Sequence, residues 1–494
     1  MCPEKSATVS VRAHRCISLA INAALAHTAK VPHPSLFVAD CTFNTGTMSE
    51  CRNVSTAPGP RIAMAQSVRR PWPAPRRTAA NAPVRCSSSS GEGPQAAVRR
   101  SAKYPPNFWN YGSMESLVAG KHANNLVEPF SLDKLKVRVR HLLLREAELL
   151  PKLKVIDTLQ RLGVADHFDE EISAMLNSIS MARQEPLLGV LKDSNGDFKK
   201  SLQNDVKSLL SLYEASHLAF EGEDHLDEAR TFSTEALRER LPSTNLHLRT
   251  SVCNALAVPL HWSASRLQTR WFINHYAGDI EADPLMLHFA KLDFNNVQNL
   301  HQQELARMTS WWRDANLNET LPFARDRLME CFYFATGVAW EPCHGACREV
   351  VAKTFALIVL LDDIYDIYGT LDELVMFTDA IERWEAAASE QLPEYMKAIY
   401  HTILNTSNEV AEHVFMRDGC DVRFLLKKSW HDLCKAFLLE AKWHLNNYKP
   451  TLKEYLENGW VSVSGPLMIT HAFPMLKMDV TQNPEINLEV IRIC

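Results

Sequence analysis

The sequence predicts an all-α protein made of two helical domains. Apolar residues recur at helical spacing over residues 131–176, and similar amphipathic segments return at 198–217, 227–240 and 287–313. Alternating strand patterns are almost absent from the chain. Only 17 of the 494 residues are glycine, and the charged stretches are rich in Leu, Ala, Glu and Lys, a composition that favours helices over sheets.

Turn and breaker residues separate these helical segments. Pro151 is expected to open a helix, at a position where proline is tolerated, and Gly163 to end it. Asn195-Gly196 marks a turn further along. Helical periodicity breaks over residues 259–267, so we place a domain boundary there, between helical domains at 99–268 and 269–494.

The first 98 residues differ in composition from the rest of the chain. Up to Ser90 there are eleven Lys or Arg residues but only three acidic ones, together with many Ser, Ala and Pro. A basic, serine-rich and acid-poor segment is typical of organelle transit peptides. We therefore expect residues 1–98 to be a disordered leader for chloroplast import, and a cytoplasmic location if this leader is not a transit peptide.

The net charge and the distribution of apolar residues give no sign of nucleic acid or a membrane as a partner. A net charge of −5 gives no reason to expect nucleic acid. No apolar run approaches the roughly 18 residues that are needed to span a bilayer. We therefore expect neither nucleic acid nor a membrane as a partner, and a monomeric protein.

The most informative motif is the string DDIYD, which closes a helix whose preceding turns, residues 355–361, are wholly apolar. Asp362 and Asp366 are four residues apart and share one helical face, whereas Asp363 lies about 100° round the helix. Two carboxylates on one face repel each other unless a cation bridges them, and oxygen ligands with open positions for phosphate suit Mg²⁺. A merely solvated helix end is the alternative, but carboxylates there oppose the helix dipole.

A pair of arginines and a group of aromatic residues precede this motif. Arg325 and Arg327 are two residues apart, and two planar guanidinium groups can embrace a diphosphate. The aromatic residues at 332–334 and Trp340 could stabilise a carbocation through their ring faces. Taken singly, the arginines fit surface salt bridges and the aromatics fit core packing. Together with the aspartates they describe a site for making a carbocation.

These motifs resemble those of plant class I terpene synthases. Similar stretches include LAKLDFNNVQNLHQQEL, SWWRDANL, DDIYDIYGTLDELVMFTDAIERW and YKPTLKEYLENGWVSVSGP, and the similarity covers residues 99 to 485 approximately. Arg99-Arg100, followed by eight residues and Trp109, resembles the tandem-arginine motif of the monoterpene-synthase group. In that group the motif closes over the active site. The resemblance implies an N-terminal α-barrel relic followed by a class I helical bundle.

The resemblance also implies an activity, the Mg²⁺-dependent ionisation of a prenyl diphosphate, with Mn²⁺ as an alternative metal. Asp362 and Asp366 would ligate the metal with the support of Asp363, and Arg325 and Arg327 would hold the diphosphate. The tandem-arginine motif and the leader favour geranyl diphosphate and a monoterpene product. A sesquiterpene synthase that acts on farnesyl diphosphate is the alternative.

Further substrate-binding residues follow from the same resemblance. Phe334 would line the cavity with its aromatic side chain. The helix break around Ser462 and Ser464 would expose carbonyl groups that steer the cation. The tandem-arginine motif, Arg99, Arg100 and Trp109, would close over the site.

The sequence departs from the family pattern in three places. Phe334 stands where the family usually has tryptophan, and a helical segment between residues 178–180 and Asn195 is shorter than usual. The second metal motif is not reached before Cys494, so we expect a C-terminally truncated bundle, and a catalytically inactive synthase stays an alternative. A chain-elongating prenyltransferase would need a second aspartate-rich motif, and a class II activity an Asp-x-Asp-Asp string. The sequence contains neither.

Overall fold

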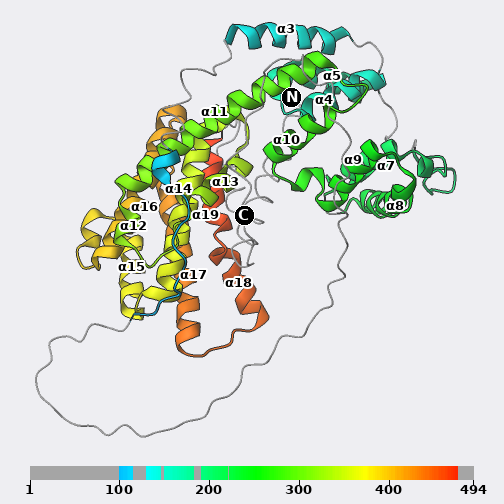
Figure 1. Ribbon diagram of the computed structural model, residues 1–494. Helices are drawn as coiled ribbons and strands as arrows, with labels where there is room; N and C mark the ends of the chain where they lie inside the picture. Colours follow the sequence, from blue (N-terminus) through cyan, green and yellow to red (C-terminus); the bar gives the residue numbers. More distant parts are fainter. Residues whose placement is uncertain (1–98, 115–128, 146–148, 183–190, 221, 477–494) are drawn as a thin grey trace, which may run out of the picture. The chain divides into compact units, whose positions relative to one another are not determined.

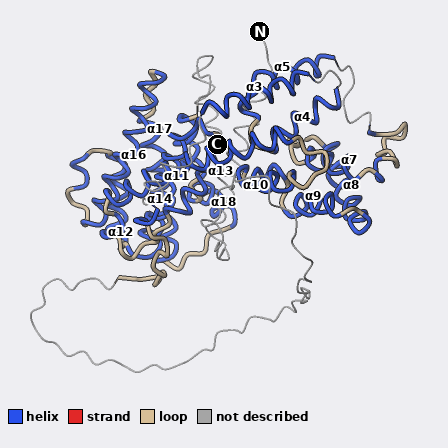
Figure 2. The backbone as a smooth tube through the Cα atoms, turned by 45° about the horizontal axis from the view of Figure 1, so that its top comes forward, coloured by secondary structure: helices blue, strands red, loops and turns tan. Residues whose placement is uncertain are grey.

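The computed structural model describes residues 99–114, 129–145, 149–182, 191–220 and 222–476. Within these ranges the only strand-like feature is an isolated antiparallel bridge between Lys192 and Phe198, and the ordered elements are helices joined by loops (Figure 2). The all-α prediction is therefore confirmed. The expected leader at 1–98 and most of the shortened segment before Asn195 lie outside the described residues.

The described part of the chain before residue 280 contains a helical turn at 111–114 and seven longer α-helices. They are α3 (Pro129–Arg145), α4 (Leu149–Arg161), α5 (Asp169–Ala182), α7 (Val206–Ser216), α8 (Asp224–Arg240), α9 (Leu246–Ala257) and α10 (Ser265–Tyr276). Pro151 lies in the first turn of α4, as predicted. Gly163 follows α4 with φ of 72°, and a Cβ atom there would meet Thr269 Oγ1 at 2.7 Å, so this turn requires glycine.

The chain from residue 284 onward supplies the second set of helices. They are α11 (Pro284–Asp314), α12 (Leu317–Thr320), α13 (Leu328–Val338), α14 (Gly345–Asp363), α15 (Leu371–Arg383), α16 (Glu394–Asp418), α17 (Arg423–Leu445), α18 (Leu452–Ser462) and α19 (Gly465–Ala472). None of the described helices is long and apolar enough to cross a membrane.

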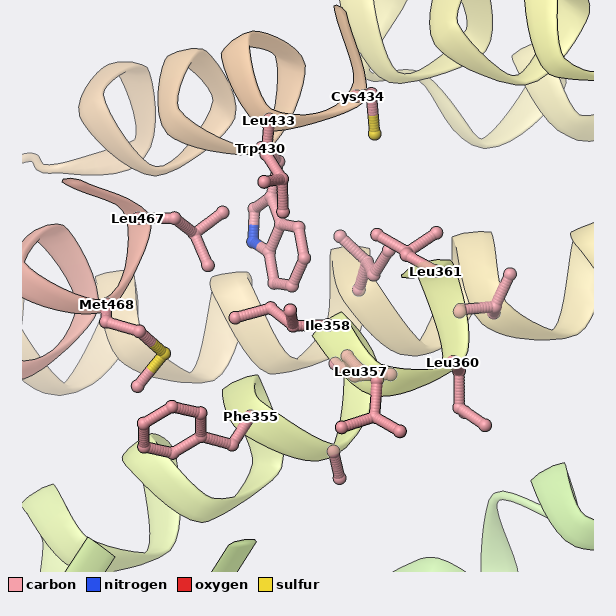
Figure 3. Close-up of a cluster of buried hydrophobic side chains, with 14 of the residues drawn as sticks. Phe355, Leu357, Ile358, Leu360, Leu361, Trp430, Leu433, Cys434, Leu467 and Met468 are labelled. Atoms are coloured by element: carbon pink, nitrogen blue, oxygen red, sulfur yellow. The ribbon is translucent and has the colours of Figure 1, made fainter. Parts of the chain in front are cut away.

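Helix α14 is the central helix of this second set. Helices α11, α13, α16 and α19 all pack against it, and most of its 19 residues are buried (Figure 1). Figure 3 shows Ile358 of α14 beside Trp430 of α17 and Leu467 of α19. Residues 355–361 of α14 are apolar all round, so this stretch must be enclosed on every side. The packing therefore fixes the C-terminal end of α14, where the aspartates lie.

A buried ion pair joins α14 to α11 and to the loop that follows α13. Arg348 of α14 and Glu304 of α11 are both fully buried, with Arg348 Nη2 2.7 Å from Glu304 Oε1. Arg348 Nη1 also donates to the carbonyl oxygens of Ala339 (2.7 Å) and Glu341 (2.5 Å). A Cβ atom on Gly345 would lie 2.7 Å from Glu304 Oε1, so glycine makes room for this pair. The pair thus fixes α14 relative to α13.

Candidate metal and diphosphate site

The aspartate motif lies where α14 changes its winding. The α-helix ends at Asp363, and the next five residues form a π-helical turn, η6 (Ile364–Tyr368). Asp366 therefore lies in a wider turn than the regular α-helix that the spacing predicts. Insertions of this kind are frequent at functional sites. Thr370 then starts α15 with a capping box, so the chain leaves the site immediately after the turn.

The carboxylates of Asp362 and Glu440 lie near enough to Asp366 to affect its pKa. Partial burial, followed by the negative charges of Asp362 and Glu440, raises the pKa of Asp366 to about 7. Asp366 is exposed, so a cation can reach its carboxylate. A bound cation would relieve the repulsion between the carboxylates, which is one cause of the raised pKa. Glu440 belongs to α17, and Asn458 Nδ2 of α18 donates to its Oε1 atom at 2.8 Å.

Arg325 brings the predicted diphosphate clamp to the aspartates. Its Nη2 atom donates to Asp362 Oδ2 at 2.5 Å, and its Nε atom donates to Asp363 Oδ1 at 2.9 Å. Its backbone N–H donates to Asp363 Oδ2 at 2.7 Å. Asp363 is 1% exposed, so both of its oxygens face Arg325 rather than open solvent. Metal ligation by Asp363 stays a prediction, and the geometry favours a role in positioning Arg325.

Arg327 lies at the other end of the same loop. It is the N-cap residue of α13, and its Nη1 atom lies 3.4 Å from Glu330 Oε1 within the first turn of that helix. Its side chain is 35% exposed, which leaves room for a ligand. Asp326 lies between the two arginines, and its Oδ1 atom is 3.5 Å from the backbone N–H of Leu328.

The N-terminal segment 99–114 reaches the site through two tyrosines. The Arg325 guanidinium carbon lies 5.0 Å from the centre of the Tyr104 ring, and burial followed by the negative charge of Asp363 raises the pKa of Tyr104. The Tyr111 hydroxyl donates to Asp326 Oδ1. Residues 99–114 are drawn in blue in Figure 1. These contacts between the segment and the site are made by Tyr104 and Tyr111, which the sequence analysis did not single out.

The predicted residues of the tandem-arginine motif have different surroundings. Arg99 is half-buried and Arg100 is exposed. Trp109 is half-buried, its ring centre lies 4.5 Å from that of Phe108, and its indole N–H is buried without a hydrogen-bond partner among the described residues. Closure of the site by these three side chains stays a prediction.

The predicted cavity residues lie on α13 and at the α18–α19 junction. Phe334 is half-buried, and its ring centre is 6.0 Å from that of Phe355 on α14. The helix breaks after Ser462, and Ser464 adopts a left-handed conformation with φ of 65° before α19 begins. The carbonyl of Ser464 accepts from Met468 N at 3.0 Å, so that group is already engaged within α19.

Glu440, Tyr104 and Tyr111 are the residues near the site that sequence reasoning missed. Glu440 follows Phe437-Leu438-Leu439, and a charged residue after such an apolar run is a signal that could have found it. The two tyrosines flank Trp109 inside the segment that the tandem-arginine motif marks. No periodicity distinguishes them, because the segment has no regular element around Tyr104.

Comparison with known proteins identifies the family. The sequence model described as "Terpene synthase family, metal binding domain" matches residues 313–491, and that described as "Terpene synthase, N-terminal domain" matches residues 184–256. An alpha-thujene synthase of Litsea cubeba, named as chloroplastic, is 41% identical over 416 residues, which span 79% of this chain and 71% of that protein. This chain belongs to the terpene synthase family.

Other relatives and solved structures agree with this assignment. A geraniol synthase of Cinnamomum tenuipile, also named as chloroplastic, is 40% identical over 80% of this terpene synthase and 69% of its own length. Isoprene synthase from grey poplar leaves, in complex with three Mg²⁺ ions and dimethylallyl-S-thiolodiphosphate, is 38% identical with a TM-score of 0.68. That likeness covers 78% of this chain and 77% of the other. Limonene synthase with 2-fluorolinalyl diphosphate is 35% identical with a TM-score of 0.70, over 77% of this chain and 76% of the other.

The donor set of this terpene synthase suits Mg²⁺. In the described part of the chain no three His, Cys, Asp or Glu side chains are arranged to hold a metal ion by themselves. Mg²⁺ is commonly bound by one or two carboxylates that share it with water and substrate phosphate groups. Asp362 and Asp366 supply such oxygens, and their mutual repulsion is what a divalent cation would remove.

Proposed function

We propose that this terpene synthase ionises geranyl diphosphate in a Mg²⁺-dependent reaction and converts it to an acyclic or cyclic monoterpene. One observation carries the proposal. Arg325 contacts Asp362, which is 37 residues away in sequence, so the diphosphate clamp and the metal carboxylates occupy one place. The names of the relatives support the substrate class, since they include thujene, geraniol, myrcene and limonene synthases.

Each polar residue has a distinct role in this proposal. Asp362 and Asp366 hold Mg²⁺, for which Mn²⁺ can substitute, and Glu440 adds negative charge beside them. The bound metal supplies Lewis-acid stabilisation of the departing diphosphate. Asp363 orients Arg325, and diphosphate oxygens replace Asp362 as the partner of its guanidinium group. Arg327 offers a second guanidinium to the same ligand.

The apolar residues of the site protect the cation that forms. No general base is needed for ionisation, and exclusion of water prevents capture of the cation. Phe334 presents a ring face that can stabilise positive charge. The Phe334 ring packs against Phe355 of the buried core, and Phe355 lies on the same helix, α14, as Asp362.

The remaining features of the proposal concern organisation and location. We propose helical domains at 99–268 and 269–494 in a monomeric enzyme. The relatives named as chloroplastic support import into plastids, directed by residues 1–98.

Product analysis tests the proposed activity. Purified protein is incubated with geranyl or farnesyl diphosphate in the presence of Mg²⁺, Mn²⁺ or a chelator, and volatile products are identified by gas chromatography and mass spectrometry. We expect monoterpene formation from geranyl diphosphate with either metal and none with the chelator. An Asp362→Ala/Asp366→Ala variant serves as the inactive control. Product from farnesyl diphosphate alone would contradict the substrate assignment, and no product above the control would contradict the activity.

A further inference from the structure

Asp326 is the carboxylate that separates the two arginines of the clamp. Residues 322–327 precede α13 without forming a helix of their own, so the loop depends on side-chain contacts for its orientation. Arg327 is the N-cap of α13 but makes no side-chain cap. The Oδ1 atom of Asp326 lies 3.5 Å from Leu328 N, too long for a strong bond, and it accepts a hydrogen bond from the Tyr111 hydroxyl.

Tyr111 is well placed to hold this carboxylate. Asn107 Nδ2 donates to the Tyr111 oxygen at 2.8 Å, which leaves the hydroxyl hydrogen for Asp326. The Tyr111 ring is half-buried and packs against the hydrophobic core of the C-terminal helices. Burial raises the pKa of Tyr111, so the phenol stays protonated and acts as a donor.

A second tyrosine reinforces the contact between the N-terminal segment and the clamp. The Arg325 guanidinium carbon lies 5.0 Å from the centre of the Tyr104 ring. Tyr104 therefore contacts the first arginine, and Tyr111 holds the acid next to the second. The short stretch between these tyrosines thus constrains both sides of the Arg325–Arg327 loop.

Asp326 would compete with the ligand if Tyr111 did not hold it. A carboxylate adjacent to two guanidinium groups can pair with either of them, and such a pair occupies the donors that a diphosphate needs. The Tyr111 hydroxyl gives the carboxylate a neutral partner on the side of the N-terminal segment. Arg327, whose contact with Glu330 is long at 3.4 Å, thereby stays available.

We propose that Tyr111 is a positioning residue for diphosphate binding, which holds Asp326 away from Arg325 and Arg327 so that both guanidinium groups can bind the diphosphate. This inference rests on the proposed function. It predicts that loss of the Tyr111 hydroxyl weakens diphosphate binding through Asp326, rather than through loss of the fold.

The test measures binding of inorganic pyrophosphate in the presence of Mg²⁺ by isothermal titration calorimetry, with the full-length protein. We expect Tyr111→Phe to raise the dissociation constant by about 10- to 150-fold, the range that corresponds to loss of one hydrogen bond to a charged group. Tyr448→Phe is the matched control, because Tyr448 is 48% exposed and its hydroxyl bonds the surface carboxylate of Glu454 at 3.0 Å. Its dissociation constant should stay within about twofold of the wild-type value.

The double variant Tyr111→Phe/Asp326→Asn separates positioning from stability. Without its charge the residue at 326 no longer competes for the arginines, so we expect this variant to recover most of the lost affinity. A merely structural role for Tyr111 would give no such rescue, and that result would overturn the proposal, as would wild-type affinity in Tyr111→Phe. Absence of Mg²⁺-dependent binding in the wild-type protein would instead contradict the proposed function, and the inference with it.

Discussion

Asp362 and Asp363 are neighbours in sequence but have different surroundings. The Asp362 side chain is 35% exposed and has one guanidinium nitrogen beside it, whereas Asp363 is buried and receives bonds from the backbone and side chain of Arg325. A partly exposed carboxylate with one arginine beside it can still accept a metal ion. A buried one that orients an arginine cannot. The two residues should therefore respond differently to the same substitution.

We expect Asp362→Asn to lower the turnover number by about 100-fold and to raise the Mg²⁺ concentration needed for half-maximal activity, since it removes charge from the metal site. Asp363→Asn should lower activity by about tenfold through a misplaced Arg325, with the Mg²⁺ requirement nearly unchanged. Steady-state kinetics over a range of Mg²⁺ concentrations distinguishes the two. Equal shifts in Mg²⁺ requirement would make Asp363 a metal ligand.

Phe334 offers a second test at the scale of one side chain. Tryptophan has a larger π face, so Phe334→Trp should stabilise the cation better and raise the turnover number by about 2- to 10-fold, with a changed product ratio. Phe415→Trp on α16 is the control, because Phe415 is 55% exposed. Product analysis on geranyl diphosphate provides both measurements. An unchanged rate and product ratio would show that residue 334 does not face the cation.

Residue types at the site were predictable from sequence, but their partners were not. The string DDIYD and the pair Arg325 and Arg327 specify carboxylates and guanidinium groups, because their chemistry is local. Which aspartate an arginine meets depends on packing between α13 and α14. That packing gives Asp363, rather than Asp362, the larger number of bonds from Arg325.

At the scale of whole elements, α11 and α14 are joined by two ion pairs of the same chemistry and opposite burial. Arg348 and Glu304 are fully buried, whereas Arg307 is 55% exposed in its pair with Glu349. Removing one partner of a buried pair leaves an uncompensated charge in the interior. An exposed pair contributes little, because water screens both charges.

We therefore expect Arg348→Met to lower the free energy of unfolding by about 3–5 kcal/mol, and Arg307→Met by less than about 1 kcal/mol. Urea unfolding followed by circular dichroism measures both values. Comparable losses in the two variants would contradict the role assigned to the buried pair.

Helices α16, α17 and α19 meet at a buried histidine. His471 Nδ1 donates to the carbonyl of Leu467 at 2.9 Å, and its Nε2 atom accepts from Trp430 Nε1 at 3.1 Å, so the ring is neutral. Trp430 Nε1 also lies 3.1 Å from Ser407 Oγ of α16. Burial lowers the pKa of His471 to about 4. Protonation of His471 Nε2 would remove the acceptor of the hydrogen bond from Trp430 Nε1.

This histidine should make stability depend on pH. Its pKa is lower in the folded state than the usual 6.5, so below that pH the unfolded chain binds a proton that the folded protein excludes. The stabilisation is complete above pH 6.5 and is lost as pH falls toward about 4, by on the order of 3 kcal/mol. His471→Gln should remove this part of the slope in urea unfolding between pH 7 and 4.5. An identical slope in both proteins would contradict the assignment.

Helix positions were predicted better than the winding of the site helix. Hydrophobic periodicity located α7, α8 and most of α11, because each buries one face over many turns. The π-helical turn at Ile364–Tyr368 has no periodic signal, since it spans five residues and depends on what packs around it.

At the scale of the whole molecule, motifs spread from residue 99 to Pro466 specify one architecture, and this redundancy is why family and fold could be predicted together. Contacts between distant segments could not be predicted in this way. Tyr111 donates to Asp326, which is 215 residues away in sequence, and neither residue type nor spacing predicts such a pair. The Tyr111–Asp326 contact nevertheless connects the N-terminal segment to the clamp.

The central claim is that Asp362, Asp366 and Arg325 form a single site for a metal ion and a diphosphate. Calorimetric titration of inorganic pyrophosphate, with saturating Mg²⁺ and with a chelator, tests it most directly. We predict at least about tenfold tighter binding with Mg²⁺, a gain that Asp362→Asn/Asp366→Asn should abolish because binding of the two ligands is thermodynamically linked. Equal affinity with and without Mg²⁺, or an undiminished gain in the double variant, would contradict the claim.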